Sequence, residues 1–180
     1  MKDSLNSKTK LEENYNRKTY APKTPLIKPI FSYEELEQTR QVLKSGWTAK
    51  GPKAHEFEEL VGETLNVRNV IAVTNCTSAL HLALMALNVE WGDTVIISDY
   101  TFPATGFAVR QVGASVIHCD VDPKTYNMNP VHFESLCKKY LPKAVIVVHA
   151  FGQCADMDEI LNIARTYDVK VIEDAAQVAH

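Results

Sequence analysis

Glycine is scarce in this chain, and its glycines form no dinucleotide-binding fingerprint. The 180 residues contain 7 glycines, and the spacing G-x-G-x-x-G does not occur. Folds that bind NAD use those glycines for a tight turn and for the close approach of the backbone to the pyrophosphate. The sequence therefore argues against a dinucleotide cofactor.

The cysteines lack the spacing of a metal site. Cys76, Cys119, Cys137 and Cys154 form no C-x-x-C pair and fit no zinc template. The group His149, Cys154, Asp156 and Asp158 also fits no known ligand spacing, and Asp156 is better placed to cap a helix. We expect no metal, and thiols that are reduced.

Strong charge and long apolar runs are also missing. The formal net charge is −3, which gives no electrostatic reason to expect nucleic acid or an anionic membrane as a partner. No apolar run is long enough to span a bilayer, and the first residues do not resemble a signal peptide. We expect a cytoplasmic protein with no membrane partner. Residues 1–24 contain few large apolar side chains and are expected to form a flexible polar tail before a domain of residues 25–180.

From residue 70 onward, short apolar runs alternate with helical patterns. We expect strands at 70–73, 95–97, 115–119, 144–148 and 169–173, and helices at 78–87, 101–113, 130–140 and 156–167. Two helices precede them, the first opened by a capping box at Ser32 and Glu35. This alternation predicts an α/β fold with a mostly parallel sheet and flanking helices.

Three loops at the carboxyl edge of the predicted sheet carry polar or aromatic residues. Cys76, Thr77 and Ser78 open an apolar helix, where backbone N–H groups and hydroxyls can hold a phosphate, although Thr77 or Ser78 could equally be a simple cap. Phe102 follows the next strand and could stack on a planar ring or belong to the core. Asp174 ends the last strand, where an ionised carboxylate usually has several N–H donors or a cationic partner, either an internal lysine or arginine or a protonated ring nitrogen.

One ligand would use all three loops at once. Pyridoxal 5′-phosphate has a phosphate, a flat ring and a basic ring nitrogen, and a carboxylate beside that nitrogen keeps the ring an electron sink. The sequence therefore favours a pyridoxal phosphate site.

At these positions the chain resembles the DegT/DnrJ/EryC1/StrS family of pyridoxal-phosphate-dependent sugar aminotransferases. The matching segments run in the family's order from about residue 27 and include Trp47 with Gly51-Pro52, Thr74–Leu80, Gly92–Ile96, Thr101–Thr105, Gly113-Ala114, Asp120–Asp122, His149 with Gly152, and Glu173–Gln177. The resemblance implies the large domain of the aspartate-aminotransferase-like type I fold, in incomplete form.

The resemblance also implies a role for each matching residue. Thr77, Ser78 and the backbone at Cys76 would hold the phosphate, and Phe102 would stack on the pyridine ring. Asp174 would pair with the ring nitrogen, and Gln177 would contact the side of the ring that carries the phenolic oxygen. Cys76 stands where the family usually has glycine.

In the family, the Schiff-base lysine, a further phosphate-binding serine and a small C-terminal domain follow the segment that ends here at Gln177. Every lysine of this chain precedes Asp174. The whole enzyme would transfer an amino group, usually from glutamate, to a nucleotide-linked keto-sugar, and it would be a homodimer. We expect the 180 residues alone to bind the cofactor weakly or not at all and to be inactive. Two alternatives remain, a sugar dehydratase of the same fold and a non-catalytic subunit that pairs with a full-length homologue.

Overall fold

The structure is a computed structural model that describes residues 29–178, which form two compact units. Residues 29–70 are the helical unit and residues 71–178 are the sheet unit. The polar tail expected at residues 1–24 lies outside the described residues. No helix between residues 29 and 178 is both long and apolar enough to cross a membrane.

The helical unit contains the two helices α2 (Tyr33–Ser45) and α3 (Pro52–Leu65). The predicted capping box is present, because Ser32 Oγ accepts a hydrogen bond from the Glu34 amide and the Glu35 carboxylate accepts one from the Ser32 amide. Gly46 ends α2 in the left-handed conformation. Neither helix buries a residue within the described part of the chain, so their apolar side chains stay accessible.

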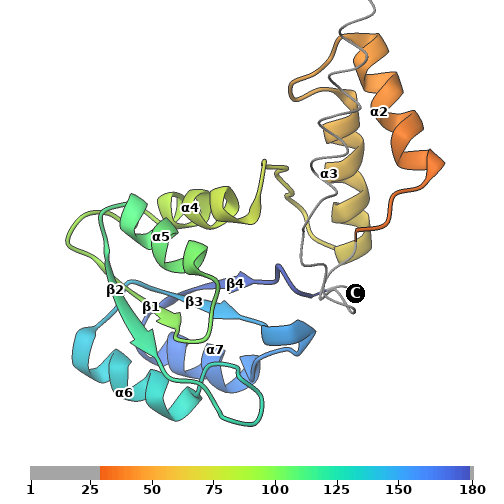
Figure 1. Cartoon of the computed structure of the whole chain (residues 1–180). Helices are drawn as coiled ribbons and strands as arrows, with labels where there is room; N and C mark the ends of the chain where they lie inside the picture. The colour runs from red at the N-terminus through yellow and green to blue at the C-terminus, as the bar shows by residue number, and fades with distance from the viewer. Residues whose placement is uncertain (1–28, 179–180) are drawn as a thin grey trace, which may run out of the picture. The chain divides into compact units, whose positions relative to one another are not determined.

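The sheet unit is a four-stranded parallel sheet with helices on both faces (Figure 1). The strand order is β2-β1-β3-β4. The strands are β1 (Thr94–Ser98), β2 (Ser115–Cys119), β3 (Ala144–Val148) and β4 (Lys170–Asp174). The helices are α4 (Cys76–Ala86), α5 (Pro103–Gln111), α6 (Pro130–Tyr140) and α7 (Met157–Thr166), with the short turn η1 (Ala150–Gly152) after β3. These elements confirm the predicted parallel α/β fold.

Alternate residues of the central strands face opposite sides of the sheet. Val95 and Ile97 of β1 belong to one buried cluster, with residues of α4 and α5. Ile96 belongs to the other cluster, with residues of α6 and α7. Because successive strand side chains point to opposite faces, the near-continuous apolar strands fill two cores at once.

The strand predicted at residues 70–73 is not present in the structure. These residues have no regular secondary structure, and Ile71 is largely exposed. A short apolar run becomes a strand only where a neighbouring strand completes its ladder of hydrogen bonds, and the four-stranded sheet of the described residues does not include this segment. The segment is apolar as predicted, but the prediction of a strand is wrong.

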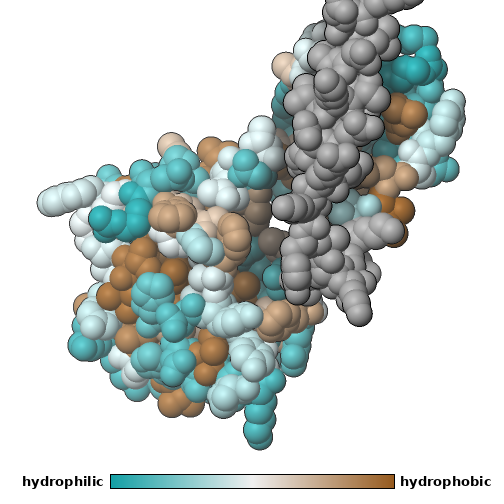
Figure 2. Space-filling view, viewed as in Figure 1, coloured by the Kyte–Doolittle hydropathy of each residue, from teal (hydrophilic) through white to brown (hydrophobic). Residues whose placement is uncertain are grey.

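Apolar side chains are also exposed on the sheet unit. Figure 2 shows hydrophobic residues in brown among hydrophilic ones on the face that it draws. The large exposed side chains of this unit include Trp91, Phe107, Val131 and Leu141. The two buried clusters therefore account for only part of the apolar residues of the chain.

An ion pair joins two loops at the amino edge of the sheet. Lys143 Nζ lies 2.7 Å from Asp93 Oδ2, which also accepts from the Glu90 amide at 2.8 Å. The hydrogen bond from Lys143, followed by that from the Glu90 amide, lowers the pKa of Asp93. Because the pair is partly exposed, its contribution to stability is small.

We expect Asp93→Asn to lower the free energy of unfolding at pH 7 by roughly 0.5–1 kcal/mol. Because the pKa of Asp93 is lowered in the folded state, the difference between parent and variant is fully present above about pH 4 and disappears as the pH falls through the folded-state pKa. Urea unfolding at several pH values measures it. A difference that grows toward acid pH would contradict the assignment.

Candidate functional site

Asp174 is the last residue of β4 and points to the α4 and α5 side of the sheet. It pairs with Val148 of β3, and Ile172, two residues earlier, packs against the cluster that α4 and α5 share. The period of two in a strand places Asp174 on the same face. Its side chain is buried, with the residue only 7% exposed.

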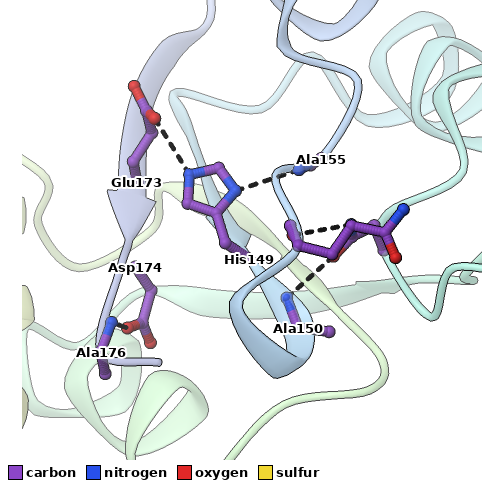
Figure 3. Close-up of polar contacts among 8 residues, drawn as sticks. His149, Ala150, Ala155, Glu173, Asp174 and Ala176 are labelled. Carbon is purple, nitrogen blue, oxygen red and sulfur yellow. Dashed lines mark hydrogen bonds and ion pairs between the residues drawn. The ribbon is translucent and has the colours of Figure 1, made fainter. Parts of the chain in front are cut away.

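Only neutral donors contact the Asp174 carboxylate. Oδ1 accepts from the Ala176 amide at 3.1 Å and lies 3.6 Å from Cys76 Sγ, and Oδ2 lies 3.5 Å from Thr105 Oγ1 (the amide contact is drawn in Figure 3). Within the sheet unit, residues 71–178, no lysine, arginine or histidine nitrogen lies within 4.0 Å of this carboxylate. The internal cation considered from the sequence is therefore absent from this unit.

Lys170 and Lys50 each form an ion pair with an acidic residue other than Asp174. Lys170 begins β4, at the opposite end of the strand from Asp174, and its ammonium pairs with Asp168 at 2.9 Å. Lys50 pairs with Glu58 at 2.8 Å within the helical unit. Lys170 therefore does not contact the Asp174 carboxylate.

A cavity of about 350 Å³ opens beside Asp174 at the carboxyl edge of the sheet. Its lining combines residues from three loops: Tyr100, Thr101, Phe102, Pro103, Val148, Ala150, Asp174, Ala176 and Gln177. The volume is in the range of small-molecule sites. The structure thus brings three of the sequence-predicted residues, Phe102, Asp174 and Gln177, to one cavity.

Phe102 is a surface residue of this cavity and does not belong to the core. It precedes α5 as its N-cap residue and is 77% exposed. Pro103 follows at the first position of the helix, where its missing N–H costs nothing. The core alternative for this aromatic residue is therefore wrong, and its ring is available for stacking.

Gln177 is held by the turn that follows β3. Its Oε1 accepts a hydrogen bond from the Phe151 amide at 2.7 Å. Phe151 and Gly152 both have positive φ, 56° and 82°, and a Cβ on Gly152 would lie 3.1 Å from the Gln177 carbonyl oxygen. Glycine at 152 allows this close approach. With its oxygen engaged, the Gln177 amide group has Nε2 left as its donor.

The start of α4 is capped by a residue that the sequence argument did not name. Asn75 Oδ1 accepts from the Ser78 amide at 2.9 Å and from Ser78 Oγ at 3.1 Å. Capping by Thr77 or Ser78 is therefore wrong, and the first-turn N–H groups at Cys76 and Thr77 have no carbonyl partner within the helix. Thr77 and Ser78 do not line the cavity, whereas Cys76 reaches the edge of the site through its contact with Asp174.

Cys76 adopts a helical backbone at the position where the family usually has glycine. It is the first residue of α4, and it is not among the residues with positive φ. The cysteine is therefore accommodated without the strain that a left-handed conformation would impose.

His149 supports the loop that follows β3, and Figure 3 shows its ring between Glu173 of β4 and Ala155. Its Nδ1 accepts from the Ala155 amide at 3.1 Å, so Nε2 carries the hydrogen and donates to Glu173 Oε2 at 3.0 Å. The buried Asn127 side chain binds the same loop, accepting from the Ala150 amide at 2.9 Å and donating to the Gln153 carbonyl at 3.0 Å. Together they fix the turn that positions Gln177.

The sequence reasoning missed Thr105 and Asn127, which the structure places at or around the site. Thr105 and Asp174 are 69 positions apart in the sequence, and no short sequence motif predicts a contact over that separation. Among the residues described, no group of three or more histidine, cysteine, aspartate or glutamate side chains is placed to hold a metal ion.

The thiols differ in burial, and this gives a direct chemical test of the fold. Burial raises the pKa of Cys119 to about 12 and that of Cys137 to about 11. Burial, and then the Asp174 carboxylate, raise the pKa of Cys76. Cys154 is exposed. The thiolate is the reactive form, so all three raised values slow alkylation.

We expect iodoacetamide at pH 8 to modify Cys154 first, then Cys76, and to reach Cys119 and Cys137 only after denaturant is added. Mass spectrometry of peptides taken at successive times measures the order. Rapid modification of Cys119 or Cys137 in the native chain would show that the cluster between the sheet, α6 and α7 is not closed.

The parallel α/β sheet matches the fold of the type I pyridoxal-phosphate-dependent aminotransferases over part of their length, as solved structures with TM-scores of 0.80 show. The site fits the cofactor, because the donors to the Asp174 carboxylate are neutral and do not compensate its negative charge. A protonated ring nitrogen can therefore pair with it. The chain belongs to the DegT/DnrJ/EryC1/StrS aminotransferase family, whose model matches residues 29–180.

The chain is also similar in sequence to a polysaccharide biosynthesis protein and to a sugar aminotransferase. A spore coat polysaccharide biosynthesis protein of Bacillus subtilis, SpsC, is 38% identical over 156 residues, which are 87% of this chain and 40% of that protein. The UDP-2-acetamido-2-deoxy-3-oxo-D-glucuronate aminotransferase of Pseudomonas aeruginosa is 40% identical over 138 residues, which are 77% of this chain and 38% of the relative. The chain thus spans about 40% of the length of the relatives it matches.

A solved structure shows the same fold with a cofactor. The crystal structure of NtdA from Bacillus subtilis with bound cofactor PMP superimposes with a TM-score of 0.80 at 34% identity, over 92% of this chain and 39% of that one. The described residues therefore correspond to part of a type I pyridoxal-phosphate aminotransferase.

Proposed function

We propose that these residues are the ring- and phosphate-binding N-terminal part of a pyridoxal-phosphate-dependent aminotransferase that acts on nucleotide-linked keto-sugars. The observation that carries the proposal is the buried Asp174 carboxylate, which faces a cavity and has only neutral donors. The substrate class rests on relatives, one of which is an aminotransferase of a UDP-linked oxo-sugar.

When bound, pyridoxal phosphate supplies a ring that takes up negative charge from the carbon next to the amine. Asp174 holds a proton on the ring nitrogen and so keeps the ring able to accept that charge. Gln177 would have Nε2 free to donate to the phenolic oxygen, because its own oxygen accepts from the Phe151 amide. Phe102, exposed beside the cavity, would cover one face of the ring.

The phosphate belongs at the start of α4. The backbone N–H groups of Cys76 and Thr77 and the hydroxyls of Thr77 and Ser78 supply donors there, and the positive end of the helix favours an anion. Ser78 Oγ donates to Asn75 Oδ1 in this structure, so it has to turn its hydrogen toward the phosphate on binding.

The 180 residues alone are proposed to bind the cofactor weakly and to be inactive as a transaminase. A transaminase needs a lysine amine as imine partner and as proton carrier, and no lysine of the sheet unit contacts the Asp174 carboxylate. The complete enzyme is proposed to be a homodimer that takes its amino group from an amino acid such as glutamate.

The proposed function is tested by binding and by turnover. Titration of the ¹⁵N-labelled chain with pyridoxamine phosphate, which needs no lysine to bind, should shift the amide signals of Ala150, Ala176 and Thr77. The same chain, free of longer enzymes, should give no amino-sugar from glutamate and a nucleotide keto-sugar. Absence of shifts at the cavity would contradict the proposed weak binding by these residues, and measurable turnover would contradict the proposed inactivity.

A further inference from the structure

A chain of two hydroxyl groups ends at the Asp174 carboxylate. Thr105 of α5 is 0% exposed, and its Oγ1 lies 3.5 Å from Asp174 Oδ2. The same oxygen lies 2.7 Å from Oγ1 of Thr101, which lines the cavity. The hydroxyls therefore connect the buried carboxylate to the cavity.

The direction of each hydrogen bond follows from the chemistry of the groups. An ionised carboxylate only accepts, so Thr105 has to donate its one hydrogen to Asp174 Oδ2. Thr101 then has to donate its own hydrogen to Thr105 Oγ1. As a result, Thr101 offers the cavity only lone pairs.

The second carboxylate oxygen is held on the protein side as well. Asp174 Oδ1 accepts from the Ala176 amide and from the Cys76 thiol. The raised pKa of Cys76 keeps that thiol protonated near neutral pH, so it remains a donor. Both oxygens thus have donors from the fold, and none of these donors carries a charge.

We propose that Thr105 is a positioning residue that fixes the rotation of the Asp174 carboxylate, with Cys76 and the Ala176 amide fixing the other oxygen. The terminal torsion of an aspartate has a broad preference, so its carboxylate plane is set by hydrogen bonds rather than by the side chain itself. Donors on both oxygens orient the carboxylate toward the protonated ring nitrogen, and because they are neutral they leave the negative charge of the carboxylate uncompensated. The proposal rests on the proposed function.

The test compares two ligands that differ only at the ring nitrogen. Pyridoxamine phosphate and its analogue with C–H in place of the ring nitrogen are titrated into the 180-residue chain and followed by ligand fluorescence. The parent chain binds pyridoxamine phosphate more tightly. Thr105→Val reduces this preference by about 2- to 12-fold, the range of a typical intramolecular hydrogen bond, because the bond is long and acts on the ligand only through Asp174, whereas Thr105→Ser retains it.

Thr166→Val is the matched control, because its hydroxyl donates only to the Asn162 carbonyl on the exposed side of α7. It should leave both affinities unchanged. An equal loss for the two ligands in Thr105→Val would mean that the residue only maintains the fold. An unchanged preference would also overturn the proposal.

A measurement without ligand separates this proposal from the proposed function. If the parent chain binds neither compound, the proposed weak binding by these residues is contradicted, and a double-mutant cycle then decides the role of Thr105. Thr105→Val should lower the urea midpoint more in the parent than in the Asp174→Asn background, since it removes a donor from a buried carboxylate. Additive effects would overturn the proposal.

Discussion

Asp174→Asn is expected to lower the affinity of the chain for pyridoxamine phosphate by about 10- to 150-fold, the value of a hydrogen bond between charged groups. Asparagine keeps the size of the side chain and its place at the end of β4, but it has no charge to hold a proton on the ring nitrogen. The loss is large because the residue is buried and the described structure offers the ring no other carboxylate in the cavity lining. Isothermal titration or ligand fluorescence measures the effect.

Glu173→Gln is the matched control for this substitution. Glu173 is the adjacent acid on β4, but its side chain is on the other face, where it pairs with His149 at 3.0 Å. It should change the affinity by less than about twofold, since the glutamine side-chain oxygen can still accept the hydrogen bond from His149 Nε2 and the substitution removes only the charge of a half-exposed carboxylate. Equal losses in Glu173→Gln and Asp174→Asn would indicate a general charge effect and would contradict the role given to Asp174.

Phe133→Ala is expected to lower the free energy of unfolding by about 3–5 kcal/mol, the usual cost of removing a buried aromatic side chain. Phe133 of α6 is 0% exposed and belongs to the cluster between the sheet, α6 and α7. Its removal leaves a cavity that the close-packed strands cannot fill. Urea unfolding followed by circular dichroism measures the change.

Val131→Ala on the same helix is the control, because Val131 is 73% exposed. It should change the stability by less than about 0.5 kcal/mol. If Phe133→Ala does not fold, Phe133→Leu should give a smaller loss in the same direction. Equal losses of stability at positions 131 and 133 would contradict the conclusion that α6 buries the face carrying Phe133 and exposes the face carrying Val131.

The regular part of the fold could be predicted because its signals are local. Pro130–Tyr140, Ser115–Cys119 and Ala144–Val148 were predicted with the bounds that the structure shows. Proline at a first helical position, glycine at a turn and short β-branched runs each mark a boundary within a few residues. The run at 70–73 was predicted wrongly, since a short apolar run does not by itself distinguish a strand from an irregular segment.

The site could be predicted in part. Phe102, Asp174 and Gln177 were placed at the ligand edge from strand ends and family motifs, and all three line the cavity. Thr105 could not be found, because its contact with Asp174 is made only when α5 packs beside β4. Stacking on Phe102 and phosphate binding at Thr77 and Ser78 remain predictions for the binding experiments.

The ¹⁵N chemical shift of the ring nitrogen in labelled pyridoxamine phosphate, bound to an excess of the chain, tests the account most directly. It should be measured at a pH where the free compound has lost its ring proton. We expect the shift of a protonated pyridinium in the parent chain and that of a neutral pyridine in Asp174→Asn. A neutral ring nitrogen in the parent chain would contradict the role of Asp174 and, with it, the proposed cofactor site.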